Sequence, residues 1–326
     1  MKRIVPIALA AALLGGLGAV ATPASAGCTH RLLILSAFPG EIDKLLTSAR
    51  VTSTVVVDGR SFFVGRLAGN DVVLALTGIG LVNADHTTRT ALARFRCGSE
   101  AAIDGIVFSG VAGGRSFIGD VTIPERWTLD DGKTWMPADA GMLAVAHAAA
   151  GGVHLGDRVP VGDLACVGLD PELIRMYRMP HHPQVLFGGD GKSADPFGGR
   201  AFPCVPGGGD VFGCQPCRAP SKTLPDVVRF LRDAAPFVDP GFFLGYFQSP
   251  TPSTTTYEAE DMETGAVARV AQENGIPFIA FRAMSDGKGD PLRLPGFPFQ
   301  FFVYRQLAAD NAGTTALAFL EAWAAQ

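Results

Sequence analysis

The sequence predicts an α/β protein of three layers (α/β/α), in which helices cover both faces of a mixed, mostly parallel central sheet. Short apolar runs that suit buried strands alternate with amphipathic helix patterns. The chain has 326 residues, 48% of them hydrophobic and 18% charged, which is typical of a globular protein with a sizeable core. Its net charge is −4 and it has no basic run, so nucleic acid is not an expected partner.

The N-terminus has the pattern of an export signal. Two basic residues precede an apolar run at 4–20, and an A-x-A cleavage site follows at 24–26. The run is short and glycine-rich for a membrane anchor, which is the alternative. We therefore expect a signal peptide at 1–26, a secreted or periplasmic mature protein, and no stable membrane association after cleavage.

The first half of the mature chain is rich in strand patterns. Asp58-Gly59 separates two of them and is a signal for a hairpin with a type I′ turn. Gly78-Ile79-Gly80 then leads into a helix pattern. The predicted strands are 31–35, 53–58, 60–67, 71–77 and 103–108, and the predicted helices are about 82–95 and 139–150.

The second half begins with a stretch of Gly/Pro-rich sequence at about 155–240, which we interpret as an insertion in a single domain at 27–326. A structureless stretch of that length in a compact domain is usually functional or lid-like. The elements predicted here are a helical piece near 224–234, a strand at 242–248, a helix from about 263, a strand at 276–281 and a closing helix at about 299–325.

The six cysteines form an even set, and export would place them in an oxidising compartment, which favours disulfides. We favour a pair between Cys28 and Cys97 and leave the other pairing open. Cys214 and Cys217 have the spacing of a zinc or redox site, but no second CxxC accompanies them. We therefore expect no metal. The six residues are Cys28, Cys97, Cys166, Cys204, Cys214 and Cys217.

Three carboxylates, Asp261, Glu263 and Asp286, flank a helix pattern followed by a strand pattern. Glu263 alone could be an acidic residue in a first helical turn, and Asp286 alone could be an N-cap. If the helix crosses over to a parallel strand, however, both carboxylates lie near the sheet edge where such folds bind ligands.

Four segments in order resemble the nucleoside phosphorylase/nucleosidase superfamily, most closely its methylthioadenosine/S-adenosylhomocysteine nucleosidases. The segments are ILSAFPGE at 34–41, SGVAGG at 109–114 with IGDVTIP at 118–124, DMETGA at 261–266, and RAMSD at 282–286. IGDVTIP and the export signal also resemble plant vegetative and bark storage proteins, a branch of the same superfamily. The resemblance covers about 31–150 and 240–326 and leaves the insertion unmatched.

The resemblance implies a phosphorylase-like fold and cleavage of the N-glycosidic bond of a purine riboside such as adenosine, inosine or methylthioadenosine. In it, Glu41 activates water, Asp286 protonates the purine N7 and Glu263 binds the ribose hydroxyls. This chemistry needs two carboxyl groups in different environments and no cofactor. The remaining substrate-binding residues that it implies are Val111, Ala112, Gly113, Met262 and Ser285.

Phosphorolysis is the first alternative. A phosphate dianion requires arginines or a nest of amides. Phe108 stands where the phosphorylases carry an Arg, although Arg115 is close by. The second alternative is a non-catalytic nucleoside-binding or storage protein on the same fold.

The sequence departs from the pattern of this superfamily at two places, one expected to bind the sugar and one expected to bind the base. Val111 replaces a Ser common in the glycine-rich loop, and 249–253 replaces an aromatic residue that holds the base in the nucleosidases. Phe297, Phe299 or the insertion could supply the stacking face. We also expect a homodimer or a larger homo-oligomer.

Overall fold

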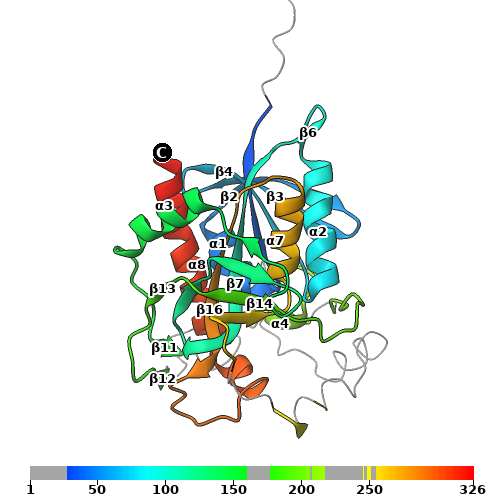
Figure 1. Cartoon of the computed structure of the whole chain (residues 1–326). Helices are drawn as coiled ribbons and strands as arrows, with labels where there is room; N and C mark the ends of the chain where they lie inside the picture. The colour runs from blue at the N-terminus through cyan, green and yellow to red at the C-terminus, as the bar shows by residue number, and fades with distance from the viewer. Residues whose placement is uncertain (1–27, 160–176, 206–207, 217–244, 246–247, 251–254) are drawn as a thin grey trace, which may run out of the picture.

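The computed structural model describes residues 28–159, 177–205, 208–216, 245, 248–250 and 255–326 (Figure 1). The predicted signal peptide, the predicted helix near 224–234, Cys166 and Cys217 lie outside these ranges.

The centre of the molecule is a parallel sheet. Strand β1 (Arg31–Ser36) pairs in parallel with β4 (Asn70–Leu76) on one side and with β7 (Ile103–Phe117) on the other. Strand β16 (Phe278–Lys288) pairs in parallel with β7. All but the first residue of β1 are buried, as expected for a strand covered on both faces.

Antiparallel strands extend this sheet and make it mixed. Strands β2 (Arg50–Val57) and β3 (Arg60–Leu67) form the predicted hairpin beside β4. Asp58 and Gly59 both have positive φ, 49° and 74°, as a type I′ turn requires. The other short strands of this sheet are β8 (Val121–Ile123), β9 (Arg126–Thr128), β10 (Met136–Pro137), β13 (Val185–Phe187), β14 (Asp190–Ser193) and β15 (Ala259–Asp261). Two further pairs form small separate sheets, β5 (Arg96–Cys97) with β6 (Glu100–Ala101) and β11 (Arg158–Val159) with β12 (Tyr177–Arg178).

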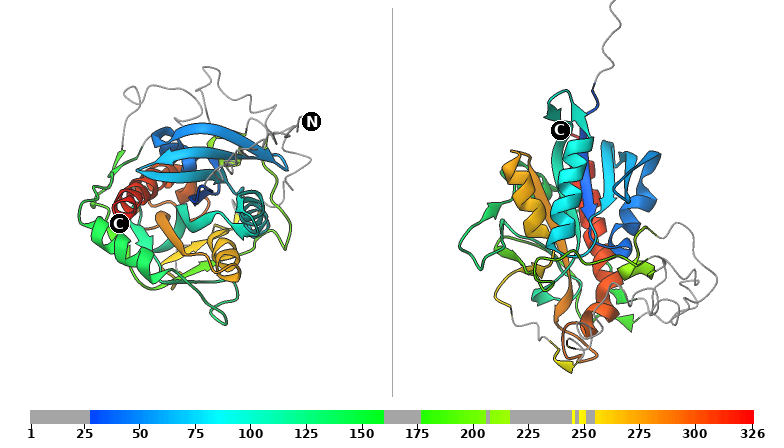
Figure 2. Two further views of the ribbon diagram at one scale, coloured as in Figure 1. Left: turned by 90° about the horizontal axis from the view of Figure 1, so that it is seen from above. Right: turned by 90° about the vertical axis from the view of Figure 1, so that its right-hand side faces the viewer.

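Helices form a layer on each face of the sheet, which confirms the predicted fold class. On one face α1 (Pro39–Ser48) and α3 (Ala140–Ala150) both pack against α8 (Phe299–Ala324). On the other face α2 (Leu81–Arg94) packs against α7 (Thr264–Glu273). Figures 1 and 2 show α3 and α8 on one side and α2 and α7 on the other. No helix in the described ranges is long and apolar enough to cross a bilayer.

Three predicted elements differ in the structure. The glycine-rich stretch after 108 is not a loop but the second half of β7, because β15 and β16 pair with it. Strand β16 likewise continues to Lys288, so that Asp286 lies within the strand and not after it. The prediction of a strand at 242–248 is wrong for the two residues of that range that the structure describes. Gly245 and Gln248 are helical, and the Ser249 N–H donates to the Gly245 carbonyl.

The stretch interpreted as an insertion contains two strands of the main sheet. Strand β13 pairs with β8, and β14 pairs with both β9 and β15. A short helix, α4 (Gly209–Phe212), follows.

Two disulfides occur among the described cysteines. Cys28 is bonded to Cys97, as favoured from the sequence, and Cys204 is bonded to Cys214.

Candidate active site

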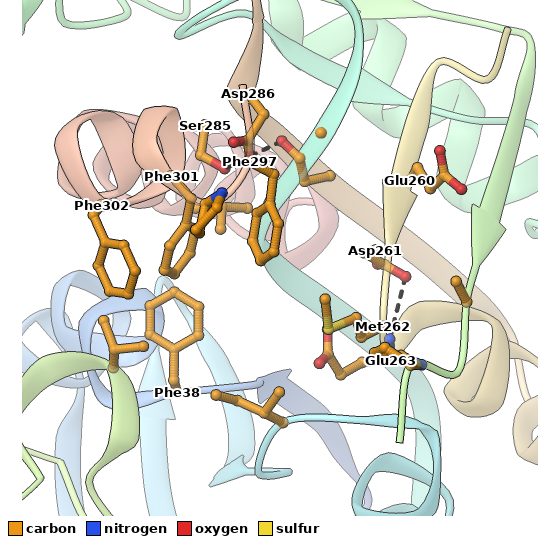
Figure 3. A pocket seen from close by; sticks show the side chains of 18 of the residues that line it. Phe38, Glu260, Asp261, Met262, Glu263, Ser285, Asp286, Phe297, Phe301 and Phe302 are labelled. Carbon is orange, nitrogen blue, oxygen red and sulfur yellow. Dashed lines mark hydrogen bonds between the residues drawn. The ribbon is translucent and has the colours of Figure 1, made fainter. Parts of the chain in front are cut away.

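A cavity of about 430 Å³ is lined by residues of β7, β16 and α8 and by the segment at 260–263. Figure 3 shows Ser285 and Asp286 on one side of it, the 260–263 segment on another and a group of phenylalanines on a third. Its acidic lining residues are Glu260, Asp261, Glu263 and Asp286, and its other lining residues include Phe38, Val111, Ala112, Gly113, Met262, Ser285, Phe297 and Phe301.

Glu41 lies one layer behind this cavity, in the first turn of α1. Its carboxylate accepts hydrogen bonds from the backbone N–H groups of Val111 (2.7 Å), Ala37 (2.6 Å) and Phe38 (3.4 Å), and its side chain is 1% exposed. Burial raises the pKa of Glu41, against the opposing effects of Arg282 and these amides. A carboxylate has about four acceptor positions. One therefore remains for a water.

The glycine-rich half of β7 must approach Glu41 closely. A Cβ built on Gly110 would lie 2.3 Å from Glu41 Oε1 and 2.6 Å from Arg282 Nη1. Only glycine can therefore stand at position 110 without displacing the carboxylate. The next three residues, Val111, Ala112 and Gly113, to which the resemblance assigns substrate binding, all line the cavity.

Glu263 faces the cavity and does not cap its own helix. Its side chain makes no capping hydrogen bond to α7, and its Oε1 accepts from the Gly80 N–H at 2.8 Å. Asp261 caps instead, since its Oδ1 accepts from the N–H groups of Glu263 and Thr264, both at 3.2 Å. Glu263 thus stands at the N-cap position of α7, as expected for a residue at the helix start, but its side chain is directed to Gly80 and not to the helix. Burial, and then the charge of Asp261, raise the pKa of Glu263, while Arg282 lowers it.

Arg282 connects the carboxylates at the base of the site, and sequence reasoning gave it no role. Its Nη2 lies 3.1 Å from Asp261 Oδ2 and 3.6 Å from Glu263 Oε2, and its Nη1 lies 4.0 Å from Glu41 Oε1. The side chain is 1% exposed. The signal that could have found it was its position as the first residue of the RAMSD segment, since a buried Arg needs carboxylate partners.

Asp286 lies within β16, opposite Gly113 of β7, so its interpretation as a helix N-cap is wrong. Its Oδ2 accepts from the Ser285 hydroxyl at 2.7 Å, and its buried Oδ1 has no hydrogen-bond partner among the described residues. Burial raises the pKa of Asp286 to about 7, against the opposing effects of hydrogen bonds from the Ser285 side chain and the Phe301 backbone. A protonated Asp286 can therefore donate into the cavity near neutral pH.

Phenylalanines form the apolar side of the cavity, and three of them come from the predicted insertion. The rings follow one another in contact, with centroid distances of 4.9 Å for Phe197–Phe202, 6.3 Å for Phe202–Phe212 and 6.4 Å for Phe212–Phe302. A Cβ on Gly80 would meet the Phe197 ring at 2.9 Å, so this wall lies beside the amide that holds Glu263. Phe297 also lines the cavity, whereas Phe299 does not.

No basic side chain lines the described cavity. Arg115, the candidate for a phosphate ligand, instead forms an exposed ion pair with Glu258. Phe108 packs beneath the site, where its ring centroid lies 4.9 Å from the Arg282 guanidinium. The described residues also contain no cluster of three potential metal ligands.

Comparisons with known proteins agree with this architecture. A model of the phosphorylase superfamily matches residues 31–175 and 252–321. An uncharacterized protein of Mycobacterium tuberculosis is 44% identical over 213 residues, which are 64% of this chain and 86% of that protein. A 5'-methylthioadenosine/S-adenosylhomocysteine nucleosidase of Listeria monocytogenes is 35% identical over 101 residues, which are 30% of this chain and 41% of the nucleosidase.

Two solved structures have the same fold. The 5'-methylthioadenosine/S-adenosylhomocysteine nucleosidase of Neisseria meningitidis, in complex with methylthio-immucillin-A, has a TM-score of 0.53 at 21% identity and covers 89% of this chain and 98% of its own. Futalosine hydrolase of Helicobacter pylori has a TM-score of 0.54 at 17% identity, and the match covers 90% of this chain and 98% of the hydrolase. The family model does not match 176–251, which supplies Phe197, Phe202 and Phe212.

Proposed function

Because the chain belongs to the phosphorylase superfamily, we propose that it is a purine nucleosidase that hydrolyses the N-glycosidic bond of a purine riboside. The observation that carries this proposal is the environment of Asp286, a buried carboxyl with a pKa of about 7 and one oxygen without a partner among the described residues, on the wall of the cavity. A general acid for a purine base must be protonated near neutral pH and able to donate to the ligand.

The other two carboxylates suit the remaining steps. As the bond to the base breaks, positive charge develops on the sugar, and a water attacks its other face. Glu41, with its raised pKa and one free acceptor position, would orient and deprotonate that water from behind Val111. Glu263 would accept hydrogen bonds from the ribose hydroxyls, while Met262 packs against the sugar.

Water suits this site better than phosphate as the attacking group. The described cavity wall has four acidic side chains and no basic one, so a dianion entering it would be repelled. Arg115 is already paired with Glu258 outside the cavity. The two similar structures are a nucleosidase in complex with methylthio-immucillin-A and a futalosine hydrolase, which also supports hydrolysis.

We also propose that the mature protein acts outside the cytoplasm as a homodimer or larger homo-oligomer. The export pattern at 1–26 supports the location, and the two disulfides suit an oxidising compartment.

The test is release of free base from adenosine, inosine and methylthioadenosine in phosphate-free buffer, with the Asp286→Asn variant as control. We expect release that needs no phosphate and that is slower by about 10² or more in the variant. Sugar 1-phosphate formed only after addition of phosphate would instead establish a phosphorylase. Tight binding of the nucleosides without release under either condition would establish a binding protein.

A further inference from the structure

An exposed disulfide lies at the opposite end of β1 from the active site. Cys28 precedes β1 and Cys97 belongs to β5, whereas Glu41 follows the carboxyl end of β1. Cys28 is exposed and Cys97 is half-buried. A thiol in solution can therefore reach this bond, and chemistry at the bond is separate from the cavity.

A histidine and a carboxylate are arranged behind the Cys97 sulfur. His30 Nε2 lies 3.6 Å from Cys97 Sγ, and His30 Nδ1 lies 2.6 Å from Asp104 Oδ1. With Asp104 accepting a hydrogen bond from Nδ1–H, the ring is held with Nε2 toward the sulfur, and a ring that is also protonated at Nε2 donates a hydrogen bond to it. Residues from before β1, from β5 and from β7 thus form a Cys–His–Asp set, although none of them belongs to the nucleosidase site.

In the chain, Arg31 follows His30 and Arg96 precedes Cys97, while the acidic Glu100 pairs with Cys97 across β5 and β6. Arg31 donates to the Thr29 carbonyl at 2.7 Å, and Arg96 donates to the Ser99 carbonyl. Neither guanidinium has a carboxylate partner among the ion pairs of the described residues. Of these groups, the His30 ring is the one in contact with the Cys97 sulfur, and a protonated imidazole beside a sulfur favours its thiolate form.

We propose that Cys28–Cys97 is a thiol-exchange site for low-molecular-weight thiols, in which Cys97 is the leaving sulfur. The thiolate of the incoming thiol attacks Cys28 Sγ and forms a mixed disulfide with it. The Cys28–Cys97 bond breaks, its electron pair remains on Cys97, and the resulting thiolate pairs with protonated His30. A second thiolate can then attack the mixed disulfide and release the oxidised thiol, and the reverse steps close the bond again. Leaving thiolates of low basicity speed such exchange.

The second disulfide provides an internal control. Cys204 is exposed and Cys214 is half-buried, so its access to solvent is similar to that of Cys28–Cys97. Among the hydrogen bonds and ion pairs of the described residues, no histidine contacts either of these sulfurs. We therefore expect the two disulfides to open at different rates because of the His30 contact and not because of a difference in solvent access.

The experiment measures how fast each bond opens in the oxidised mature protein after addition of reduced glutathione. Timed alkylation and peptide mass spectrometry follow the two disulfides in the same sample. We expect Cys28–Cys97 to open first, with glutathione attached to Cys28. His30→Ala and Asp104→Asn should each slow this bond about fivefold relative to Cys204–Cys214. His86→Ala, which alters an exposed His beside Asp58, should leave the ratio unchanged.

Three results would overturn the proposal. They are an unchanged ratio in both the His30 and the Asp104 variant, faster opening of Cys204–Cys214 in the native chain, and attachment of glutathione to Cys97 in place of Cys28. Nucleoside hydrolysis and thermal unfolding of each variant, measured in parallel, identify a variant that has lost its fold. The relative opening rates of the two disulfides do not depend on whether the chain is a nucleosidase.

Discussion

The Glu41 carboxylate accepts a 2.7 Å hydrogen bond from the backbone N–H of Val111, seventy residues further along the chain. This bond joins the first turn of α1 to the glycine-rich half of β7, and Val111 also lines the cavity. The position of the proposed base is therefore set by the same strand that forms the wall for the sugar.

Replacement of Glu41 by Gln tests this base. The amide cannot take a proton from water, so we expect turnover to fall by about 10² or more while a substrate analogue still binds. Steady-state kinetics and calorimetric titration of the analogue measure the two effects. Glu273→Gln, at an exposed position of α7, is the matched control. Unchanged turnover in Glu41→Gln would show that another group activates the water.

The raised pKa of Asp286 predicts how activity depends on pH. If the protonated form donates to the base, kcat/KM should fall as the pH rises through about 7. Asp286→Asn should have turnover lower by about 10² or more and should lack this falling limb. A pH profile of kcat/KM for both proteins checks this. A limb that persists unchanged in the variant would assign the titration to another group.

The same carboxyl affects stability, and the sign follows from the direction of its pKa. The folded-state pKa of about 7 exceeds the ordinary value of 3.8, so the folded protein holds this proton more tightly than the unfolded chain. Its contribution to stability is complete below pH 3.8 and is lost as the pH rises through about 7. The free energy of unfolding of Asp286→Asn should therefore rise relative to that of the native protein between pH 4 and pH 8. Urea unfolding at both pH values measures the difference.

Glu263→Gln should distinguish sugars. A neutral amide accepts weaker hydrogen bonds from the ribose hydroxyls than a carboxylate does. We expect kcat/KM to fall more for a riboside than for its 2′-deoxyriboside, which already lacks one of these hydroxyls. Equal losses on both substrates would contradict the assignment of Glu263 to the sugar.

The sequence predicted the local elements well because their patterns are local. The Asp58-Gly59 turn, the strand at 31–35 and the helix after Gly80 depend on turn chemistry, apolar runs and periodicity within a few residues. The second half of β7 was missed because glycines have low strand propensity and are required at 110 by close approach to Glu41, which is a tertiary contact.

The residues of the candidate site divide in the same way, into those that belong to local motifs and those that only tertiary contacts bring together. The positions of Met262, Glu263, Ser285 and Asp286 on the cavity wall could be expected from short motifs. The cluster around Arg282 could not, because it joins carboxylates from 41, 261 and 263 that only the fold brings together. The phenylalanines at 197, 202 and 212 had no periodic pattern in a Gly/Pro-rich stretch.

Arg282 should be the most sensitive charged residue of the site. Its removal leaves the buried Glu41, Asp261 and Glu263 without a cation, and loss of one partner from a buried ion pair costs about 3–5 kcal/mol. Arg282→Met should lower the free energy of unfolding by that order at pH 7. Arg89→Met, which removes a half-exposed ion pair with Asp85, should cost about 1 kcal/mol or less. Chemical unfolding compares the two, and equal costs would show that the buried cluster is held by its amides alone.

The phenylalanine wall predicts a preference at the 5′ end of the substrate. Phe202 lies next to Gly80, whose amide binds Glu263, and the Phe212 ring packs on Phe202. We therefore expect a group attached to the sugar away from the base to meet these rings. Phe212→Ala should raise KM for methylthioadenosine, with its apolar 5′ group, about tenfold more than for adenosine, whose 5′ hydroxyl gains little from an apolar wall. Phe117→Ala removes a ring that is 46% exposed and lies outside the cavity lining, and it should leave both values unchanged. If Phe212→Ala affects both substrates equally, the wall contacts the base and not the 5′ group.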